Sequence, residues 1–424
     1  MNHSLVFPAK FQFFCQRLGE ISLIATCFFL PWSVALMNVS ALLMALCWFL
    51  SGKFLELPKI LRQSPSAVLA VALFLLLAVS LIYTTAPVGY GLDIASKYRK
   101  LLYLPVVLSI VNSAPVLRRR AIDAFLWGCA LLLLASYFKL VTVLLGTDIF
   151  IDRHGFSFVH HITHGFFMAI FIFFLIERAI TAKNVSGRWS LPFLITAALA
   201  GFNLFYITPG RTGWGLCLAL TAFFFIRRRS WRWSLTGLAI VTASMIVIWQ
   251  SSSIVSARSW ELIHETERYQ PGESRTSMGQ RYDWWHNAYG LLRQSPWLGK
   301  GVGSFPSEQR ELVKSLRQPT QPTDNPHNEY LFLAEQIGVC GLLLFVALLA
   351  APSIEARGRG FPPDERRLIE GLTLAMALSC LVNSHLFDSQ QGHFYILITA
   401  LLLAGGGKVA NEKSTAASGT ESLT

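Results

Sequence analysis

The chain has 424 residues, of which 53% are hydrophobic and only 14% are charged, and its net charge is +12. Together with a mean hydropathy of +0.47, this composition excludes a soluble globular protein. An excess of basic residues in so apolar a chain is typical of cytoplasmic loops beside anionic membrane lipid, so we do not expect nucleic-acid binding.

Apolar stretches recur along nearly the whole length, which predicts an all-α polytopic membrane protein with about 12 transmembrane helices. The expected spans are residues 19–37, 39–52, 66–84, 93–112, 121–145, 162–181, 190–208, 211–226, 231–250, 328–351, 367–386 and 391–407. The first two are also compatible with one re-entrant unit.

This pattern divides the chain into four parts. Residues 1–250 hold the first nine spans, residues 251–326 form one large loop, residues 327–407 hold the last three spans, and residues 408–424 form a polar tail expected to be disordered. Basic residues gather in alternate loops, so the positive-inside rule places both termini in the cytoplasm and the large loop outside.

Five basic residues break that rule and lie at the outer ends of expected spans. Lys97, Arg99 and Lys100 begin the fourth span, Lys139 lies near the outer end of the fifth, and Arg211 lies in the short turn between the seventh and eighth. Charges there are costly unless they face a polar cavity or a partner. The alternative for the three residues of the fourth span is that they extend toward lipid head groups.

The large loop contains two ordered segments. The aromatic and leucine spacing over residues 281–292 predicts a helix lying on the membrane surface. Glycines at 299, 301 and 303 predict a tight turn. A nucleotide-binding loop is not indicated, because no Gly-Lys-Ser/Thr follows.

The end of this loop carries the sharpest candidate. Asn325 is expected to cap the tenth span, with Pro326 at the first helical position and His327 in the first turn. The positive end of the helix dipole would then lower the pKa of His327 and keep the imidazole neutral, as a general base requires. The alternative is that Asn-Pro-His only caps a helix.

Arginines beside a neutral histidine suit a phosphate-bearing substrate from which a proton is removed. Arg211 and Arg281 are the arginines of this set. No Asp-x-Asp pair or Cys-x-x-Cys motif indicates a metal, so we expect neither a metal nor a cofactor. His160, His161 and His164 could form a metal site, but packing at the membrane interface is the favoured interpretation.

Four motifs carry a resemblance to a known family. They are the turn over residues 208–213, Gly279-Gln280-Arg281 followed by Trp284, the glycine turn over residues 295–305, and Pro326-His327-Asn328-Glu329-Tyr330-Leu331. With the many spans and the large late loop, this set resembles the O-antigen ligase family. The specific motifs lie between about residues 208 and 338.

The resemblance implies a metal-independent, inverting glycosyltransferase at the periplasmic face of a Gram-negative inner membrane. The donor would be O-antigen polysaccharide on undecaprenyl diphosphate, and the acceptor a sugar of the lipid A–core. It implies that His327 lies at the reaction centre and that Arg211 and Arg281 hold the donor diphosphate. Gln280 and Asn328 are plausible orienting neighbours. Lys97, Arg99 and Lys100 would contact phosphates of the donor or of the acceptor.

Three other functions share some of these features. Protein O-oligosaccharyltransferases use the same kind of donor but tend to carry a sizeable region after the last spans, so the short tail favours the ligase. O-antigen polymerases usually have two comparable outer loops, whereas one loop dominates here. An anion or lipid transporter would need ionisable residues and broken helices at mid-membrane.

Overall fold

The computed structural model describes residues 8–147, 155–227, 231–272, 275–317 and 320–405. These residues are mostly helical and contain no β-strand, which confirms the all-α prediction. The predicted tail over residues 408–424 lies outside the described residues. The helices are α1 (Ala9–Phe29), α2 (Val34–Leu50), η1 (Lys53–Glu56), α3 (Leu57–Gln63), α4 (Pro65–Val79), η2 (Ser80–Ile82), α5 (Val88–Lys97), η3 (Arg99–Leu102), α6 (Tyr103–Asn112), α7 (Pro115–Leu144), α8 (His161–Ser186), α9 (Leu191–Phe202), η4 (Asn203–Ile207), α10 (Arg211–Ile226), α11 (Trp231–Ser251), α12 (Ser253–Glu267), α13 (Ser277–Gln294), α14 (Phe305–Ser315), α15 (Glu329–Gly358), α16 (Pro363–Ser379) and α17 (Ser389–Leu403).

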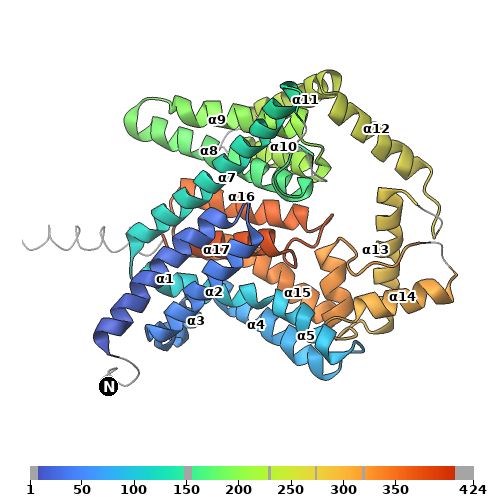
Figure 1. Cartoon of the computed structure of the whole chain (residues 1–424), viewed down its shortest axis with the longest axis horizontal. Coiled ribbons are helices and arrows are strands. Elements are labelled where there is room, and N and C mark those ends of the chain that lie inside the picture. The colour runs from blue at the N-terminus through green and yellow to red at the C-terminus, as the bar shows by residue number, and fades with distance from the viewer. Residues whose placement is uncertain (1–7, 148–154, 228–230, 273–274, 318–319, 406–424) are drawn as a thin grey trace, which may run out of the picture.

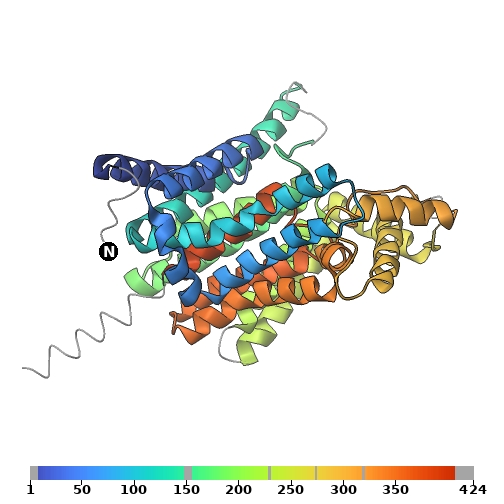
Figure 2. The ribbon, with the colours of Figure 1, turned by 90° about the horizontal axis from the view of Figure 1, so that it is seen from below.

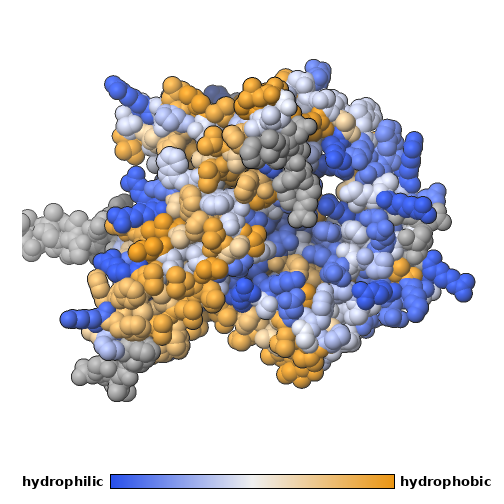
Figure 3. Space-filling model, in the orientation of Figure 1, coloured by the Kyte–Doolittle hydropathy of each residue, from blue (hydrophilic) through white to orange (hydrophobic). Residues whose placement is uncertain are grey.

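Most helices form one bundle, and α12, α13 and α14 form a lobe at one end of it (Figures 1 and 2). Figure 3 shows that the lobe surface is hydrophilic, whereas broad areas of the bundle surface are hydrophobic. This division matches a membrane-embedded bundle that carries the large loop outside the lipid.

The last helix, α17, is the centre of the bundle. Every residue from Gln390 to Leu403 is buried, which explains why this helix has no polar face. Phe394 packs against the rings of Phe125, Phe166 and Phe167, at centroid distances of 5.1, 5.5 and 5.6 Å. The loop before α17 is therefore held at a fixed position in the molecule.

Length and composition support part of the predicted set of membrane crossings. Among the residues that the structure describes, five helices are long and apolar enough to cross a membrane, or six if α2, η1 and α3 form one span bent by 81°. The five are Pro65–Ile82, Pro115–Leu144, His161–Ser186, Trp231–Ser251 and Glu329–Gly358. Each of the twelve predicted ranges contains a helix, but several of these helices are short, so twelve crossings stay a prediction.

The predicted span over residues 93–112 is not one helix. It consists of the end of α5, the 3-10 turn η3 and α6. Lys100 lies in η3 and is 1% exposed, and its ammonium binds backbone carbonyls of the loop before α17. A buried ammonium needs several oxygen partners, and the interruption of the helix brings it to them.

The tenth span is broken by the predicted glycine turn. Helical geometry is lost at Ile337 and at Gly338, where φ is 69°. The backbone N–H of Gly301 donates to the carbonyl oxygen of Gln336 at 2.8 Å, and that of Val339 donates to Pro296 at 2.8 Å. The turn thus satisfies polar groups that the break exposes. The tight turn is confirmed, and it joins the lobe to α15.

The predicted helix over residues 281–292 is confirmed within α13. Thr276 caps its start by accepting a hydrogen bond from the N–H of Gly279. Its inner face packs Ala288 and Leu291 against Phe305 and Phe332. The helix is therefore bound to α14 and α15 on that side.

Candidate functional site

A cleft of about 540 Å³ opens where the lobe meets the bundle. Its wall comes from five helices, α8, α10, α12, α13 and α16, together with Pro209 in the turn before α10 and Val382 in the loop after α16. The lining residues are His161, Ile162, Pro209, Arg211, Thr212, Gly215, Leu216, Arg258, Leu262, Ser277, Met278, Arg281, Leu378, Ser379 and Val382. One part of the wall is cationic and another is aliphatic, which suits a ligand with an anionic head and an apolar chain.

Arg211 reaches the cleft from the first position of α10. Asn203–Ile207 is a π-helix, and the chain turns between it and α10, so the side chain projects from a helix end. The guanidinium pairs with Glu261 at 3.0 Å and with Glu265 at 3.8 Å, both on α12. Arg211 therefore reaches the cleft with its charge already offset by two carboxylates.

Arg281 lies on α13 and lines the same cleft as Arg211. No carboxylate of the described residues lies within ion-pair distance of its guanidinium. Burial lowers the pKa of Arg281, and the positive charge of Arg211 lowers it further, whereas Glu265 raises it. A half-buried guanidinium with no paired acid favours binding of an anion.

His327 lies just before α15, which corrects the sequence prediction. The cap is Asn328, whose side chain accepts a hydrogen bond from the N–H of Leu331 at 3.1 Å. Asn325 has another role: its side-chain oxygen accepts from the N–H of His327 at 2.8 Å and from the hydroxyl of Ser384 at 2.6 Å. His327 has a φ of 54°, a left-handed conformation that asparagine-type turns stabilise.

The imidazole of His327 is neutral, as predicted, but for a different reason. Its pKa is lowered to about 4, mainly by burial and in addition by the charges of Arg281 and His160. The sequence predicts the helix dipole as the cause of the lowered pKa. Because His327 lies before the first residue of α15, burial of the ring and the loss of its hydration are the main cause instead. The ring also contacts Trp284, at a centroid distance of 5.5 Å. The structure thus brings His327, Arg281 and Arg211 to one side of the molecule.

Residues 195–346 match a family model described as O-antigen ligase. The resemblance to the O-antigen ligase family is confirmed. The matched segment runs from α9 into the first part of α15 and contains Arg211, Arg281 and His327. No curated protein matches the sequence.

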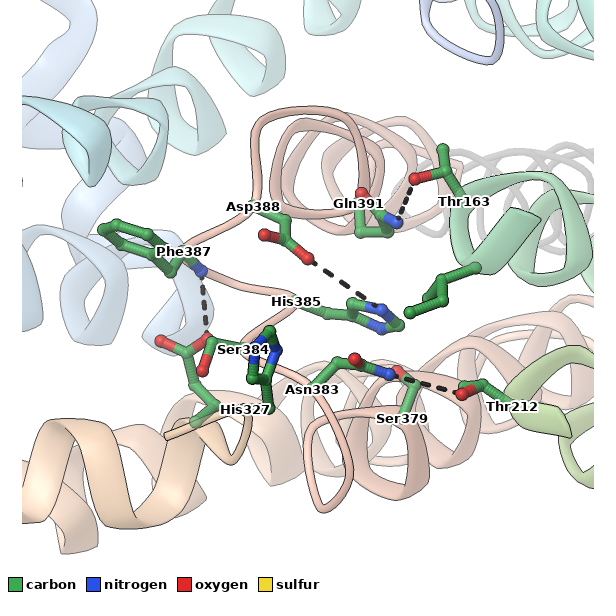
Figure 4. Close-up of polar contacts among 12 residues, drawn as sticks. Thr163, Thr212, His327, Ser379, Asn383, Ser384, His385, Phe387, Asp388 and Gln391 are labelled. Atoms are coloured by element: carbon green, nitrogen blue, oxygen red, sulfur yellow. Dashed lines mark hydrogen bonds and ion pairs between the residues drawn. The ribbon is translucent and has the colours of Figure 1, made fainter. Parts of the chain in front are cut away.

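One histidine near the site lies outside the segment that matches the O-antigen ligase model. His385, in the loop between α16 and α17, is fully buried, and neither ring nitrogen has a hydrogen-bond partner among the described residues. Its Nε2 lies 4.0 Å from the carboxylate of Asp388 (Figure 4). Sequence reasoning missed His385 because a lone histidine between two spans has no distinctive pattern.

The loop that carries His385 is fixed by bonds from four directions. Lys100 donates to three of its carbonyls, and Glu329 accepts from the N–H of Phe387 at 3.0 Å. Asn383 donates to the hydroxyl of Thr212 at 3.3 Å (Figure 4). The hydroxyl of Ser384 donates to the side-chain oxygen of Asn325. This loop therefore links the start of α10 to the turn that holds His327.

The three basic residues predicted at the outer end of the fourth span have different surroundings in the structure. The ammonium of Lys100 donates to backbone carbonyl oxygens of the loop before α17 at 2.6–2.9 Å, so Lys100 positions this loop. Lys97 pairs with Asp93 at 3.5 Å and lies over the ring of Phe387. Arg99 is exposed and donates to the carbonyl of Ser96. Only Lys97 and Arg99 stay candidates for phosphate contact.

The remaining candidates have modest roles in the structure. Gln280 lies on α13 next to Arg281 and is half-buried. His164 is buried and bonds Asn203 at 2.8 Å, whereas the rings of His160 and His161 stack 4.3 Å apart. No group of three or more metal-ligating side chains occurs among the described residues.

A second cavity, of about 480 Å³, is lined by Arg118 and Arg178 among others. These arginines pair with Glu365 at 2.8 Å and with Asp123 at 2.5 Å. Because its charges are mutually compensated, this cavity is a weaker candidate for anion binding than the cleft.

Proposed function

We propose that this protein transfers O-antigen polysaccharide from undecaprenyl diphosphate to a sugar of the lipid A–core. The reaction would take place at the periplasmic face of a Gram-negative inner membrane, without a metal and with inversion at the anomeric carbon. One observation carries the proposal: the guanidinium of Arg281, which has no acid partner among the described residues, stands near Arg211 and a neutral His327. The match to the O-antigen ligase model supports a membrane glycosyltransferase of this type.

In this mechanism an acceptor hydroxyl attacks the anomeric carbon of the donor glycan. The bond from that carbon to the diphosphate oxygen breaks, and the hydroxyl proton passes to the free ring nitrogen of His327. Arg281 and Arg211 offset the negative charge that develops on the leaving diphosphate. The ring of Trp284, and the hydrogen bond that the backbone N–H of His327 donates to the Asn325 side chain, hold the histidine in place while this occurs.

The aliphatic part of the cleft suits the lipid portion of the donor. Ile162, Leu216, Leu262, Leu378 and Val382 line it beside the arginines. A polyprenyl chain entering between helices would meet these side chains while its diphosphate reaches the guanidinium groups. Sequence order does not bring these residues together, because they come from four different helices and from the loop that follows α16.

The deciding experiment incubates the purified full-length protein with undecaprenyl-diphosphate-linked glycan in EDTA. One reaction contains lipid A–core and another contains a pilin-type protein. Glycan on the lipid is the expected product. Glycan on the protein would instead identify an O-oligosaccharyltransferase, and extension of the donor glycan in both reactions would identify a polymerase. Loss of transfer in EDTA that magnesium restores would refute the metal-free mechanism.

Three variants test the residues assigned to the site. Arg211→Ala, Arg281→Ala and His327→Ala should each reduce transfer by about 100-fold or more while the protein stays folded in the membrane. Lysine at either arginine position should also be poor, because it cannot bind two phosphate oxygens in the same planar way. Arg293→Ala is the matched control, since Arg293 is an exposed residue further along α13.

A further inference from the structure

The anion site of the cleft contains its own carboxylates. Glu261 pairs with Arg211 at 3.0 Å and with Arg258 at 2.8 Å, and Glu265 lies 3.8 Å from Arg211. Both acids come from the same face of α12, one helical turn apart. The only arginine of this cleft without a carboxylate partner among the described residues is Arg281.

Both carboxylates are built into the site. Glu265 is only 10% exposed, and it also accepts a hydrogen bond from the N–H of Met278 at 3.1 Å, at the start of α13. The hydrogen bond from Arg258 lowers the pKa of Glu261, and Arg211 lowers it too, so this acid is charged at neutral pH. The acids therefore occupy the positions near Arg211 that phosphate oxygens would take.

We propose that Glu261 and Glu265 determine which lipids enter the cleft, by competing with phosphate groups for the arginines. A membrane contains anionic phospholipids whose head group carries a single net charge, and two unpaired arginines at its surface would bind them. With the acids in place, a singly charged phospholipid head group can pair with the guanidinium of Arg281 but is repelled by the carboxylates of Glu261 and Glu265. A polyprenyl diphosphate carries enough charge to displace the acids from Arg211 and to span both arginines. The inference rests on the proposed function, because it assumes that the diphosphate binds Arg211 and Arg281.

Specificity of this kind comes from a repulsive element as well as an attractive one. A partly exposed ion pair contributes little free energy. Loss of the pairs between Arg211 and the two glutamates should therefore change the affinity for an anionic lipid by a small factor. Arg211 is 26% exposed and Glu261 40% exposed, which places these pairs in that range. Removing both acids should therefore strengthen anion binding by roughly five- to tenfold.

The test measures binding of radiolabelled undecaprenyl diphosphate to the full-length protein in nanodiscs. The double variant Glu261→Gln, Glu265→Gln keeps side-chain oxygens that can still accept the Met278 hydrogen bond. In phosphatidylethanolamine nanodiscs it should bind roughly five- to tenfold more tightly than the natural protein. In nanodiscs rich in phosphatidylglycerol this gain should disappear, because the phospholipid then competes, while the natural protein should change little.

Glu267→Gln is the matched control, because Glu267 ends the same helix, is 66% exposed and lies 3.6 Å from His264 on its own helix. It should bind like the natural protein in both membranes. Equal or weaker binding by the double variant in phosphatidylethanolamine would overturn the inference. Tighter binding that phosphatidylglycerol does not reduce would overturn the exclusion of phospholipids. If Arg211→Ala and Arg281→Ala bind the diphosphate normally, the proposed function fails instead.

Discussion

Replacing Lys100 by methionine distinguishes a loop anchor from a phosphate ligand. Methionine keeps the length of the side chain and removes the ammonium. That ammonium donates to the carbonyl oxygens of Leu386, Phe387 and Asp388 at 2.9, 2.8 and 2.6 Å, and the residue is 1% exposed. The substitution therefore leaves three acceptors in the loop before α17 without their donor.

The size of the effect follows from these contacts. A hydrogen bond from a charged donor contributes roughly 1.5–3 kcal/mol, but three bonds from one ammonium are not additive. Removing one partner of a buried charged interaction costs about 3–5 kcal/mol. For a chain of this length we expect the melting temperature to fall by roughly 3–6 °C.

The assay is thermal unfolding of the purified protein, followed by undecaprenyl diphosphate binding below the transition. Lys100→Met should unfold at lower temperature and still bind the diphosphate with its usual affinity. Gly392→Ala should behave in the same way, because a Cβ there would lie 2.7 Å from the Lys100 ammonium and 2.4 Å from the Leu386 oxygen. Lys97→Met is the stability control, since Lys97 is partly exposed and pairs with Asp93.

A Lys100→Met protein that melts at the usual temperature but binds the diphosphate weakly would refute this reasoning. It would mean that the ammonium leaves the carbonyls for a phosphate when the donor is present. Lower stability with normal binding would confirm that Lys100 acts through the position of the loop that carries His385.

Three further predictions follow from the site and from α15. Asn325→Ala should reduce transfer by roughly 100-fold, because His327 loses the bond that fixes its backbone, whereas Asn325→Asp should retain more activity. The pKa of His327 is lowered to about 4, so the unfolded chain takes up this proton at higher pH than the folded protein does. Thermal stability should therefore fall as the pH drops from about 6.5 to about 4, and His327→Gln should remove part of that fall. Gly338→Ala should lower the melting temperature, since its Cβ would lie 2.1 Å from the carbonyl oxygen of Trp297, while Gly358→Ala, which meets open space, should not.

The local features of the chain could be predicted from its sequence. Apolar runs gave helices in all twelve predicted ranges, because the backbone of an apolar segment satisfies its own hydrogen bonds only as a helix. The glycines at 299, 301 and 303 predicted a tight turn, and their φ angles are all positive, at 68°, 90° and 83° respectively. The direction of the His327 pKa shift was predicted as well, although its cause was not.

The partners of polar groups were decided only by the tertiary structure. The break at Gly338 lies inside an apolar run, and it exists because a turn some forty residues earlier supplies its hydrogen bonds. Lys100 resembles an outer phosphate ligand in the sequence, but the loop before α17 occupies its ammonium. Hydrophobic periodicity reports which face of a helix is apolar and contains no information about distant partners.

The candidate site also has residues that the sequence indicates and contacts that only the folded structure reveals. Arg211, Arg281 and His327 could be chosen from the sequence, because an arginine in a short turn and a histidine at the start of a span are locally unusual. The carboxylates of Glu261 and Glu265, the hydrogen bonds of Asn325 and the burial of His385 could not. Residue types and local turns are set by neighbours along the chain, whereas charge pairing and burial depend on segments that only the folded bundle brings into contact.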